Sequence, residues 1–293
     1  MDTIAVRPVF TLSLAHGRFL ALGDRTLVMG IVNATPDSFA GGVTDPEEAA
    51  ALALRMEEAG ADIVDIGGES TRPGADAVSE ADELARVMPV IERLAGRVRV
   101  PISIDTYKAG VASAAVGAGA CIVNDISGLE YDHRLAEVVA KTGAGVVLMH
   151  TRGRSRQMYR EAAYLDIVAD VAAELGQAMD RAAAAGVSAD AIVLDPGLGF
   201  AKRADQSFAL IAALPRFHEL GRPLLVGPSR KSFLTTALGQ VAPADRDWGT
   251  AAAVTSAILS GAHIVRVHDV RSMAQVAKVA DAIRARRSIQ KGT

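Results

Sequence analysis

Eight short apolar runs, each followed at once by polar or glycine-rich sequence, constrain the fold of this chain more than any other feature. Such runs are typical of parallel strands that are buried on both faces of a sheet. They lie at about residues 27–32, 63–66, 102–104, 122–123, 145–149, 191–194, 224–226 and 264–265. Most precede a segment with helix signals, so the sequence predicts an α/β protein built as a closed (β/α)8 TIM barrel.

The same pattern of apolar runs predicts the domain organisation of the chain. Residues 9–14 and 18–20 flank a turn and predict a short N-terminal β-hairpin, within an extension that covers residues 1–26. We expect a single barrel domain at 27–286 and a C-terminal tail at 287–293. An open doubly wound sheet is the alternative, but the Gly-x-Gly-x-x-Gly turn that would favour it does not follow the first strand.

Local signals place several helices. Asp45 followed by Pro46 predicts an N-cap with proline at the first helical position. Ser79 and Asp82 resemble a capping box. We expect these and later helices at 46–59, 80–94, 164–185 and 272–286. An insertion at 151–163 contains four arginines, which we expect to be solvated.

Composition excludes several classes of protein. A net charge of −3 over 293 residues indicates no partner among nucleic acids or membrane surfaces. A single cysteine, Cys121, excludes an internal disulfide and a cysteine metal cluster, and its apolar neighbours predict a buried position. Because no signal peptide or membrane-length apolar run is evident, we expect a cytoplasmic protein.

Chemically informative side chains gather where the predicted strands end. They are Asn33, Asp65, Asp105, Asn124, Met149, Asp195, Lys231, Arg266 and His268. One such residue alone can be a helix cap or a turn former. Arg266 and His268, however, are two residues apart on an extended segment, so both face the barrel interior or its mouth. An unpaired buried charge is costly, so packing explains this pair poorly, and we expect a binding site at this end of the barrel.

The chemistry of these side chains narrows the ligand. Asp105, Asp195 and Asn124 suit a flat heterocycle whose edge carries N–H donors and ring-nitrogen acceptors. The cations at the ends of the last two strands, together with Asn33, suit a polyanion. Segment 229–231 is predicted to begin a helix, whose N-terminal amides favour phosphate. The pattern therefore predicts a phosphorylated ring compound, with its ring deep in the barrel and its phosphates at the rim.

Seven motifs, in order along residues 27–286, resemble those of the dihydropteroate synthases, enzymes of the folate pathway. They are NATPDSF (33–39), DIGGESTRPG (65–74), SIDT (103–106), NDI (124–126), DPGLGF (195–200), SRKS (229–232) and RVHDV (266–270). The resemblance implies condensation of 6-hydroxymethyl-7,8-dihydropterin diphosphate with p-aminobenzoate, with Mg²⁺, to give 7,8-dihydropteroate and diphosphate. It also implies a homodimer and a sulfonamide target.

The resemblance assigns roles by position. The implied pterin contacts are Asp105, Asn124, Met149, Asp195 and Lys231. The implied diphosphate contacts are Asn33, Thr71, Arg266 and His268, and Asn33 would also contact Mg²⁺. The implied p-aminobenzoate pocket comprises Thr35, Pro36, Asp37, Phe39, Arg72, Phe200, Lys231 and Ser232. Catalysis would fall to Asp105, Asp195, Lys231, Arg266 and His268.

The chain departs from the family pattern at one point. After Phe39 it continues with Ala40, Gly41 and Gly42, one residue shorter than the family's Ser–Asp–Gly–Gly and without its acid. This short first loop favours one alternative, a non-catalytic pterin-binding paralogue. A pterin-dependent methyltransferase is a second alternative, although the cationic motifs argue against it because a methyl donor has no diphosphate. A third is an aldolase that forms a Schiff base on Lys231.

Overall fold

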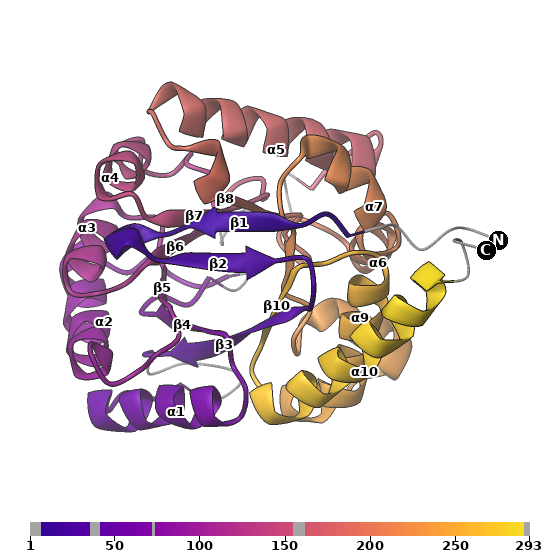
Figure 1. Ribbon diagram of the computed structural model, residues 1–293, viewed down its shortest axis with the longest axis horizontal. Helices are drawn as coiled ribbons and strands as arrows, with labels where there is room; N and C mark the ends of the chain where they lie inside the picture. Colours follow the sequence, from indigo (N-terminus) through magenta and orange to yellow (C-terminus); the bar gives the residue numbers. More distant parts are fainter. Residues whose placement is uncertain (1–6, 36–41, 72–73, 155–161, 290–293) are drawn as a thin grey trace.

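The computed structural model describes residues 7–35, 42–71, 74–154 and 162–289. Eight parallel strands form one sheet in the order β8-β7-β6-β5-β4-β3-β10-β9. A bridge between Leu194 on β8 and Leu224, just before β9, joins the two outermost strands and closes the barrel. Figure 1 shows helices around this ring of strands, so the predicted (β/α)8 barrel is confirmed.

The barrel strands lie within two residues of their predicted positions. They are β3 (Leu27–Asn33), β4 (Ile63–Gly67), β5 (Ile102–Asp105), β6 (Ile122–Asp125), β7 (Gly145–Met149), β8 (Ile192–Asp195), β9 (Leu225–Val226) and β10 (Ile264–Val267). The α-helices are α1 (Pro46–Glu58), α2 (Glu80–Leu94), α3 (Ala109–Gly117), α4 (Arg134–Thr142), α5 (Ile167–Ala184), α6 (Ala204–Ala212), α7 (Leu214–Phe217), α8 (Thr235–Leu238), α9 (Asp247–Leu259) and α10 (Val270–Ile289). The hairpin strands are β1 (Phe10–Ser13) and β2 (Phe19–Leu22).

Helix caps decide where the helices begin. The Asp45 carboxylate accepts a hydrogen bond from the Glu47 amide at 3.0 Å, and Ser79 Oγ accepts one from the Asp82 amide at 3.1 Å, so both predicted N-caps are confirmed. Helix α5 begins later than predicted because Asp166 caps it, accepting from two amides of its first turn. Helix α10 extends beyond both expected ends.

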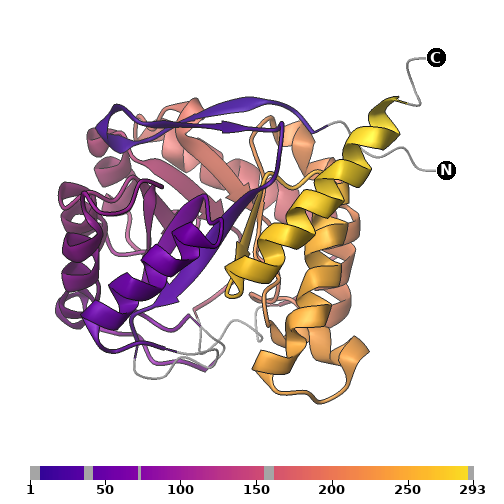
Figure 2. The same cartoon turned by 60° about the horizontal axis from the view of Figure 1, so that its bottom comes forward.

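The N-terminal hairpin covers the amino-terminal end of the barrel. Figure 2 shows it lying across one end of the ring of strands. Its residues Leu12, Leu14 and Leu22 are buried and form one apolar cluster with Met29 and Ile63 from inside the barrel. The hairpin therefore covers the interior apolar residues at this end of the barrel.

Cys121 belongs to the same interior cluster and is buried, as predicted. A second and larger cluster fills the space between the strands and the surrounding helices, and its members include Val64, Ile104 and Val254. Among the helices of the described ranges, none combines the length and apolar character needed to span a bilayer.

Candidate active site

The strand registers bring most of the predicted site residues to one edge of the sheet. Successive register partners at the carboxyl-terminal ends are Asn33, Gly67, Asp105 and Asn124 across β3 to β6, and Met149 and Asp195 across β7 and β8. Arg266 lies on β10, and His268 follows directly after that strand. Because these strands close into one barrel, the residues surround a common opening.

A charged cluster of Arg266, Asp65 and Asp105 lies at the centre of this edge. Arg266 Nε donates to Asp65 Oδ2 and Nη2 donates to Asp105 Oδ2, each at 2.6 Å. Asn124 Nδ2 donates to the same Asp65 oxygen at 3.0 Å. Burial lowers the pKa of Arg266, but attraction to the two carboxylates outweighs this and holds its pKa above the usual value. Arg266 therefore faces inward as predicted, and it is paired.

Two carboxylate oxygens of this cluster are left without a hydrogen-bond partner within the described ranges. They are Asp65 Oδ1 and Asp105 Oδ1, and both are buried. Burial raises the pKa of Asp105 to about 7, although Arg266 opposes the shift. An acceptor buried without a partner is unfavourable, which makes the pair a receptor for N–H donors.

The sequence predicts no specific role for Asp65, but the structure places this residue at the centre of the charged cluster. It is fully buried, with 0% exposure, and links Arg266 to Asn124. The available signal was an acid that interrupts an otherwise apolar strand at 63–66. Such a residue must have partners from elsewhere in the fold, because an isolated buried charge is strongly unfavourable.

Asp195 and Lys231 add a second acid and a second cation to this edge, close enough to interact electrostatically. Asp195 is buried, and its Oδ1 accepts a hydrogen bond from the Gly197 amide at 2.7 Å. Burial raises the pKa of Asp195, with Lys231 opposing. Lys231 Nζ donates to the carbonyl oxygen of Leu198 at 2.7 Å and lies 4.6 Å from the ring centre of Phe200. Burial lowers the pKa of Lys231 to about 8.

The helix predicted to begin at 229–231 begins slightly later and is short, with Lys231 as the N-cap of the helical turn that starts at Ser232. Arg230 has a left-handed backbone, with φ of 57°, and Lys231 precedes only a 3-10 turn (Ser232–Leu234) and the four-residue α8. The reason is tertiary: the Arg230 amide donates to Thr250 Oγ1, and its guanidinium pairs with Asp247 on α9. These contacts hold the chain in a turn, so no long helix presents its N-terminus to a phosphate here.

Ser229 and His268 form a polar contact between the segments that follow β9 and β10. Ser229 Oγ lies 2.9 Å from His268 Nδ1, and the His268 amide donates to the same Oγ at 3.1 Å. The two residues are therefore held together at the rim. His268 is partly exposed, as a residue that contacts a rim ligand would be.

The remaining predicted residues fall on four loops, which follow β3, β4, β8 and β9. Thr35 is buried just after β3, Thr71 is half-buried in the segment after β4, and Ser232 is exposed after β9. Phe200 is half-buried in the segment after β8 and packs in an apolar cluster with Met149. The other predicted pocket residues, Pro36, Asp37, Phe39 and Arg72, lie outside the described residues, as do Ala40 and Gly41 of the short first loop.

The arginine-rich insertion differs in part from the expectation of solvated charges. Arg152 forms an ion pair with Glu174 on α5, and its guanidinium lies 4.0 Å from the ring centre of Tyr164. Arg154 lies over the ring of Tyr131, 4.5 Å from its centre. Arg156 and Arg160 lie outside the described residues. Arg152 is therefore bound to the body of the protein through Glu174, which is distant in the sequence, whereas Arg154 is exposed, in line with the expectation.

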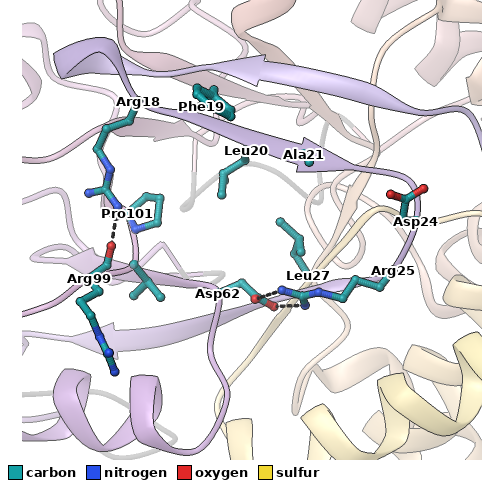
Figure 3. A pocket seen from close by; sticks show the side chains of 11 residues that line it. Arg18, Phe19, Leu20, Ala21, Asp24, Arg25, Leu27, Asp62, Arg99 and Pro101 are labelled. Atoms are coloured by element: carbon teal, nitrogen blue, oxygen red, sulfur yellow. Dashed lines mark hydrogen bonds and ion pairs between the residues drawn. The ribbon is translucent and has the colours of Figure 1, made fainter.

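A cavity of about 570 Å³ lies at the hairpin end of the barrel, away from these residues (Figure 3). Arg25 and Asp62, which both line it, form an ion pair at 2.5 Å at one edge, and Arg18 donates to the carbonyl oxygen of Arg99. Its lining shares no residue with the predicted site. The cavity and the carboxyl-terminal site are therefore separate features.

Comparison with known proteins places this arrangement in a family. The family model of the pterin-binding enzymes matches residues 29–268. The dihydropteroate synthase of Synechocystis sp. is 48% identical over 263 residues, covering 89% of this chain and 91% of the relative. That of Bacillus subtilis is 47% identical over 266 residues, covering 90% of both.

Solved structures similar to this chain belong to the same family. The dihydropteroate synthase of Yersinia pestis, in a sulfonamide drug complex, aligns with a TM-score of 0.88 and 42% identity, covering 94% of this chain and 99% of that one. The Xanthomonas albilineans enzyme, solved with 4-aminobenzoic acid, aligns with a TM-score of 0.86 and 44% identity, with the same coverage.

The chain is a closed (β/α)8 barrel with a cluster of acids and cations at its carboxyl-terminal edge, and the family model matches most of its length. These features place it in the class of pterin-binding enzymes. The family resemblance expected from the seven motifs is confirmed. The chain belongs to the dihydropteroate synthase family, whose members are transferases of folate biosynthesis.

Proposed function

We propose that this chain condenses 6-hydroxymethyl-7,8-dihydropterin diphosphate with p-aminobenzoate to give 7,8-dihydropteroate and diphosphate. The observation that carries the proposal is the cluster of Asp65, Asp105 and Arg266, with its two buried and unpartnered carboxylate oxygens. A buried acceptor without a partner costs about 1–3 kcal/mol. The N–H edge of a pterin ring supplies the missing donors, so binding would recover this free energy.

The residues around the cluster suit a pterin ring. Asp105 and Asp195 accept hydrogen bonds, and the Asn124 amide can both donate and accept. Lys231 adds a donor above this layer, and Met149 supplies an apolar contact for the ring face. These five residues come from five different strand ends or the segments that follow them, so the barrel itself sets their spacing.

The leaving group would lie toward the rim. We assign Arg266 and His268, with Asn33 and Thr71, to the diphosphate, because donors and positive charge stabilise the negative charge that gathers there as the bond breaks. The bond that breaks joins the methylene carbon to an oxygen of the diphosphate, and its electron pair leaves with that oxygen.

The aromatic amine then attacks the methylene carbon, and a carbon–nitrogen bond forms. The amine loses one proton, which is taken up by diphosphate or by solvent. Asp105 and Asp195 would stabilise the positive charge that develops on the methylene and the pterin ring. This route needs no covalent enzyme intermediate, so Lys231 acts as a binding group and not as a Schiff base.

The donor set fits Mg²⁺ that is held jointly with the substrate. Magnesium prefers oxygen ligands and commonly binds through one or two protein oxygens together with substrate phosphates. The Asn33 side-chain oxygen at the end of β3 suits this mode, and the described ranges contain no group of three or more His, Cys, Asp or Glu arranged as a separate metal site. The ion, when bound, would neutralise charge on the leaving diphosphate.

The amine substrate would lie beside the loops after β3, β4, β8 and β9. We assign its pocket to the four described residues Thr35, Phe200, Lys231 and Ser232, and to the positions Pro36, Asp37, Phe39 and Arg72. The ring of Phe200, close to the ammonium of Lys231, is suited to pack against the benzoate ring. The ammonium would attract the benzoate carboxylate.

Diphosphate release and pteroate formation, each measured with and without p-aminobenzoate and Mg²⁺, test the function. We expect pteroate only when both are present. Asp195→Asn and Lys231→Ala should each lower kcat/KM for the pterin substrate by about 100-fold, or about 2.7 kcal/mol. Arg25→Ala, at the hairpin end, is the control and should leave kcat/KM unchanged.

Two outcomes of this experiment would count against the proposal. Pterin binding by the unmodified chain without any turnover would favour the non-catalytic paralogue. Full turnover by Asp195→Asn and Lys231→Ala would show that the site is misassigned.

We also propose a cytoplasmic homodimer. Helices α9 and α10 pack together, and they expose Trp248 at 87% and Val279 at 62%. Large apolar side chains exposed on neighbouring helices suit an interface between two copies of the chain. Sedimentation of the unmodified chain and of Trp248→Glu tests this, and a monomer at micromolar concentration of the unmodified chain would contradict it.

A further inference from the structure

Lys202 follows the DPGLGF motif, and none of the roles assigned above uses it. Its side chain is buried, and the residue is 2% exposed. Its Nζ lies 2.8 Å from His150 Nδ1, 3.1 Å from the His150 carbonyl oxygen and 2.9 Å from the Phe200 carbonyl oxygen. An ammonium group has three donors, and the lysine meets three potential acceptors.

The charge state of this group follows from its neighbours. His150 Nε2 lies 2.9 Å from Glu174 Oε2, which favours a proton on Nε2 and leaves Nδ1 as an acceptor. Burial lowers the pKa of His150 to about 4, so its ring is neutral at pH 7. Burial also lowers the pKa of Lys202. A neutral amine, however, has only two donors for the three acceptors, so the contacts favour the ammonium form.

The segment that Lys202 ends is held in an unfavourable backbone conformation. Ala201 has φ of 50°, in the left-handed region, and Gly197 and Gly199 have φ of 70° and 77°. A non-glycine residue in this region costs about 1–3 kcal/mol and persists only where its surroundings hold it. A Cβ at Gly197 would lie 2.0 Å from the His150 carbonyl oxygen, so this segment passes very close to the end of β7.

The same segment holds Lys231. The Leu198 carbonyl oxygen accepts the hydrogen bond from Lys231 Nζ at 2.7 Å, and the ring of Phe200 lies beside that ammonium. The buried Lys202 binds the Phe200 carbonyl oxygen of the same segment. The position of Phe200 and of the Leu198 carbonyl therefore depends on where Lys202 ties the segment to β7.

We propose that Lys202, oriented by His150 and Glu174, is a positioning residue that sets segment 195–202 and thereby the side of the site that holds the aromatic amine. The proposal rests on the assignment of Phe200 and Lys231 to that pocket. Among the residues assigned to the pterin, Asp105, Asn124 and Asp195 lie on β5, β6 and β8, so the sheet itself holds them. Lys231 is assigned to both substrates and does depend on this segment, through the Leu198 carbonyl oxygen. Loss of the Lys202 contacts should therefore affect the amine substrate more than the pterin substrate.

The test is Lys202→Met, which keeps the length of the side chain and removes its three donors. We expect KM for p-aminobenzoate to rise about fivefold or more, and KM for the pterin diphosphate to rise by a clearly smaller factor, because only Lys231 among the residues assigned to the pterin is held by this segment. Amide hydrogen exchange in the 195–202 peptide should also become faster. A general loss of stability would not raise one KM more than the other, and it would not speed amide exchange in this peptide alone.

Arg7→Met is the matched control. Arg7 is a buried cation at the hairpin end, where it donates to Thr26 Oγ1 and pairs with Asp281. Its loss should lower the melting temperature without changing either KM or the exchange of peptide 195–202. If Lys202→Met does not fold, Glu174→Gln, which leaves Lys202 in place, should show the same KM difference to a smaller extent.

The outcomes separate the two proposals. Failure of the unmodified chain to form pteroate refutes the proposed function, whereas the exchange of peptide 195–202 still tests the role of Lys202. Unchanged exchange in folded Lys202→Met, or equal changes in both KM values, would overturn the positioning role. If Lys202→Met does not fold, a Glu174→Gln variant with no KM difference would overturn it as well.

Discussion

Asp65→Asn tests the physical core of the site. The change keeps the shape of a side chain that is fully buried and accepts hydrogen bonds from Arg266 and Asn124 on one oxygen. It removes a negative charge beside the Arg266 guanidinium. It also replaces a carboxylate oxygen by an amide NH₂, and the unpartnered Oδ1 position faces no acceptor or donor in the described part of the chain.

The expected loss of stability follows from these contacts. Removing one partner of a buried ion pair costs about 3–5 kcal/mol. Arg266 keeps Asp105 as a second partner, so we expect the lower end, about 3 kcal/mol. With an unfolding entropy of about 2.1 cal/mol/K per residue, a chain of this length should melt about 5 °C lower. Because Arg266 and Asn124 lose their common anchor, kcat/KM for the pterin substrate should fall about tenfold or more.

Thermal unfolding followed by circular dichroism, together with steady-state kinetics, measures both effects. Ser103→Ala is the control, because Ser103 is the register partner of Asp65 on β5 and its buried hydroxyl has no partner within the described ranges. That change should leave the melting temperature unchanged or raise it. If Asp65→Asn matched Ser103→Ala in both measurements, the central role of the cluster would be refuted.

Two further predictions concern the segments around Lys231. Because burial lowers the pKa of Lys231 to about 8, its ammonium loses a proton as the pH rises from about 7 to 9, and kcat/KM for the pterin substrate should fall over that range. Lys231→Arg should remove this fall, and a profile of the unmodified chain that stays flat to about pH 9.5 would contradict the assignment. Gly197→Ala should lower stability by about 2 kcal/mol or more, because its Cβ would meet the His150 carbonyl oxygen at a left-handed φ. Gly176→Ala within α5, where a Cβ has open space, should be neutral or stabilising by up to about 1 kcal/mol, and equal melting temperatures of the two variants would contradict this reasoning.

Much of the barrel could be predicted because strands and helix caps are local signals. Each strand is a short apolar run. The side chains of Asp45 and Ser79 cap their helices by accepting a hydrogen bond from an amide two or three residues later. The inward direction of Arg266 also followed from spacing alone, since residues two apart on a strand share a face. These local patterns predict the structure well because burial stabilises the apolar strands and hydrogen bonds stabilise the helix caps, whatever lies elsewhere in the chain.

Other features depended on partners far away in the sequence. Arg230 was expected to enter a helix, but Thr250 and Asp247 hold it in a turn. Arg152 was expected to be solvated, but Glu174 binds it. A local pattern carries no information about such partners, so these two expectations failed.

The sequence by itself determined the number and order of the strands and the family of the chain, because contiguous residues carry the signals for both. Only the tertiary structure decided which charges meet. Asp65 and Arg266 are 201 residues apart, and barrel closure brings them to 2.6 Å. Burial, which no short stretch of sequence controls, then sets the pKa of Asp105 and of Lys231 and gives the site its chemistry.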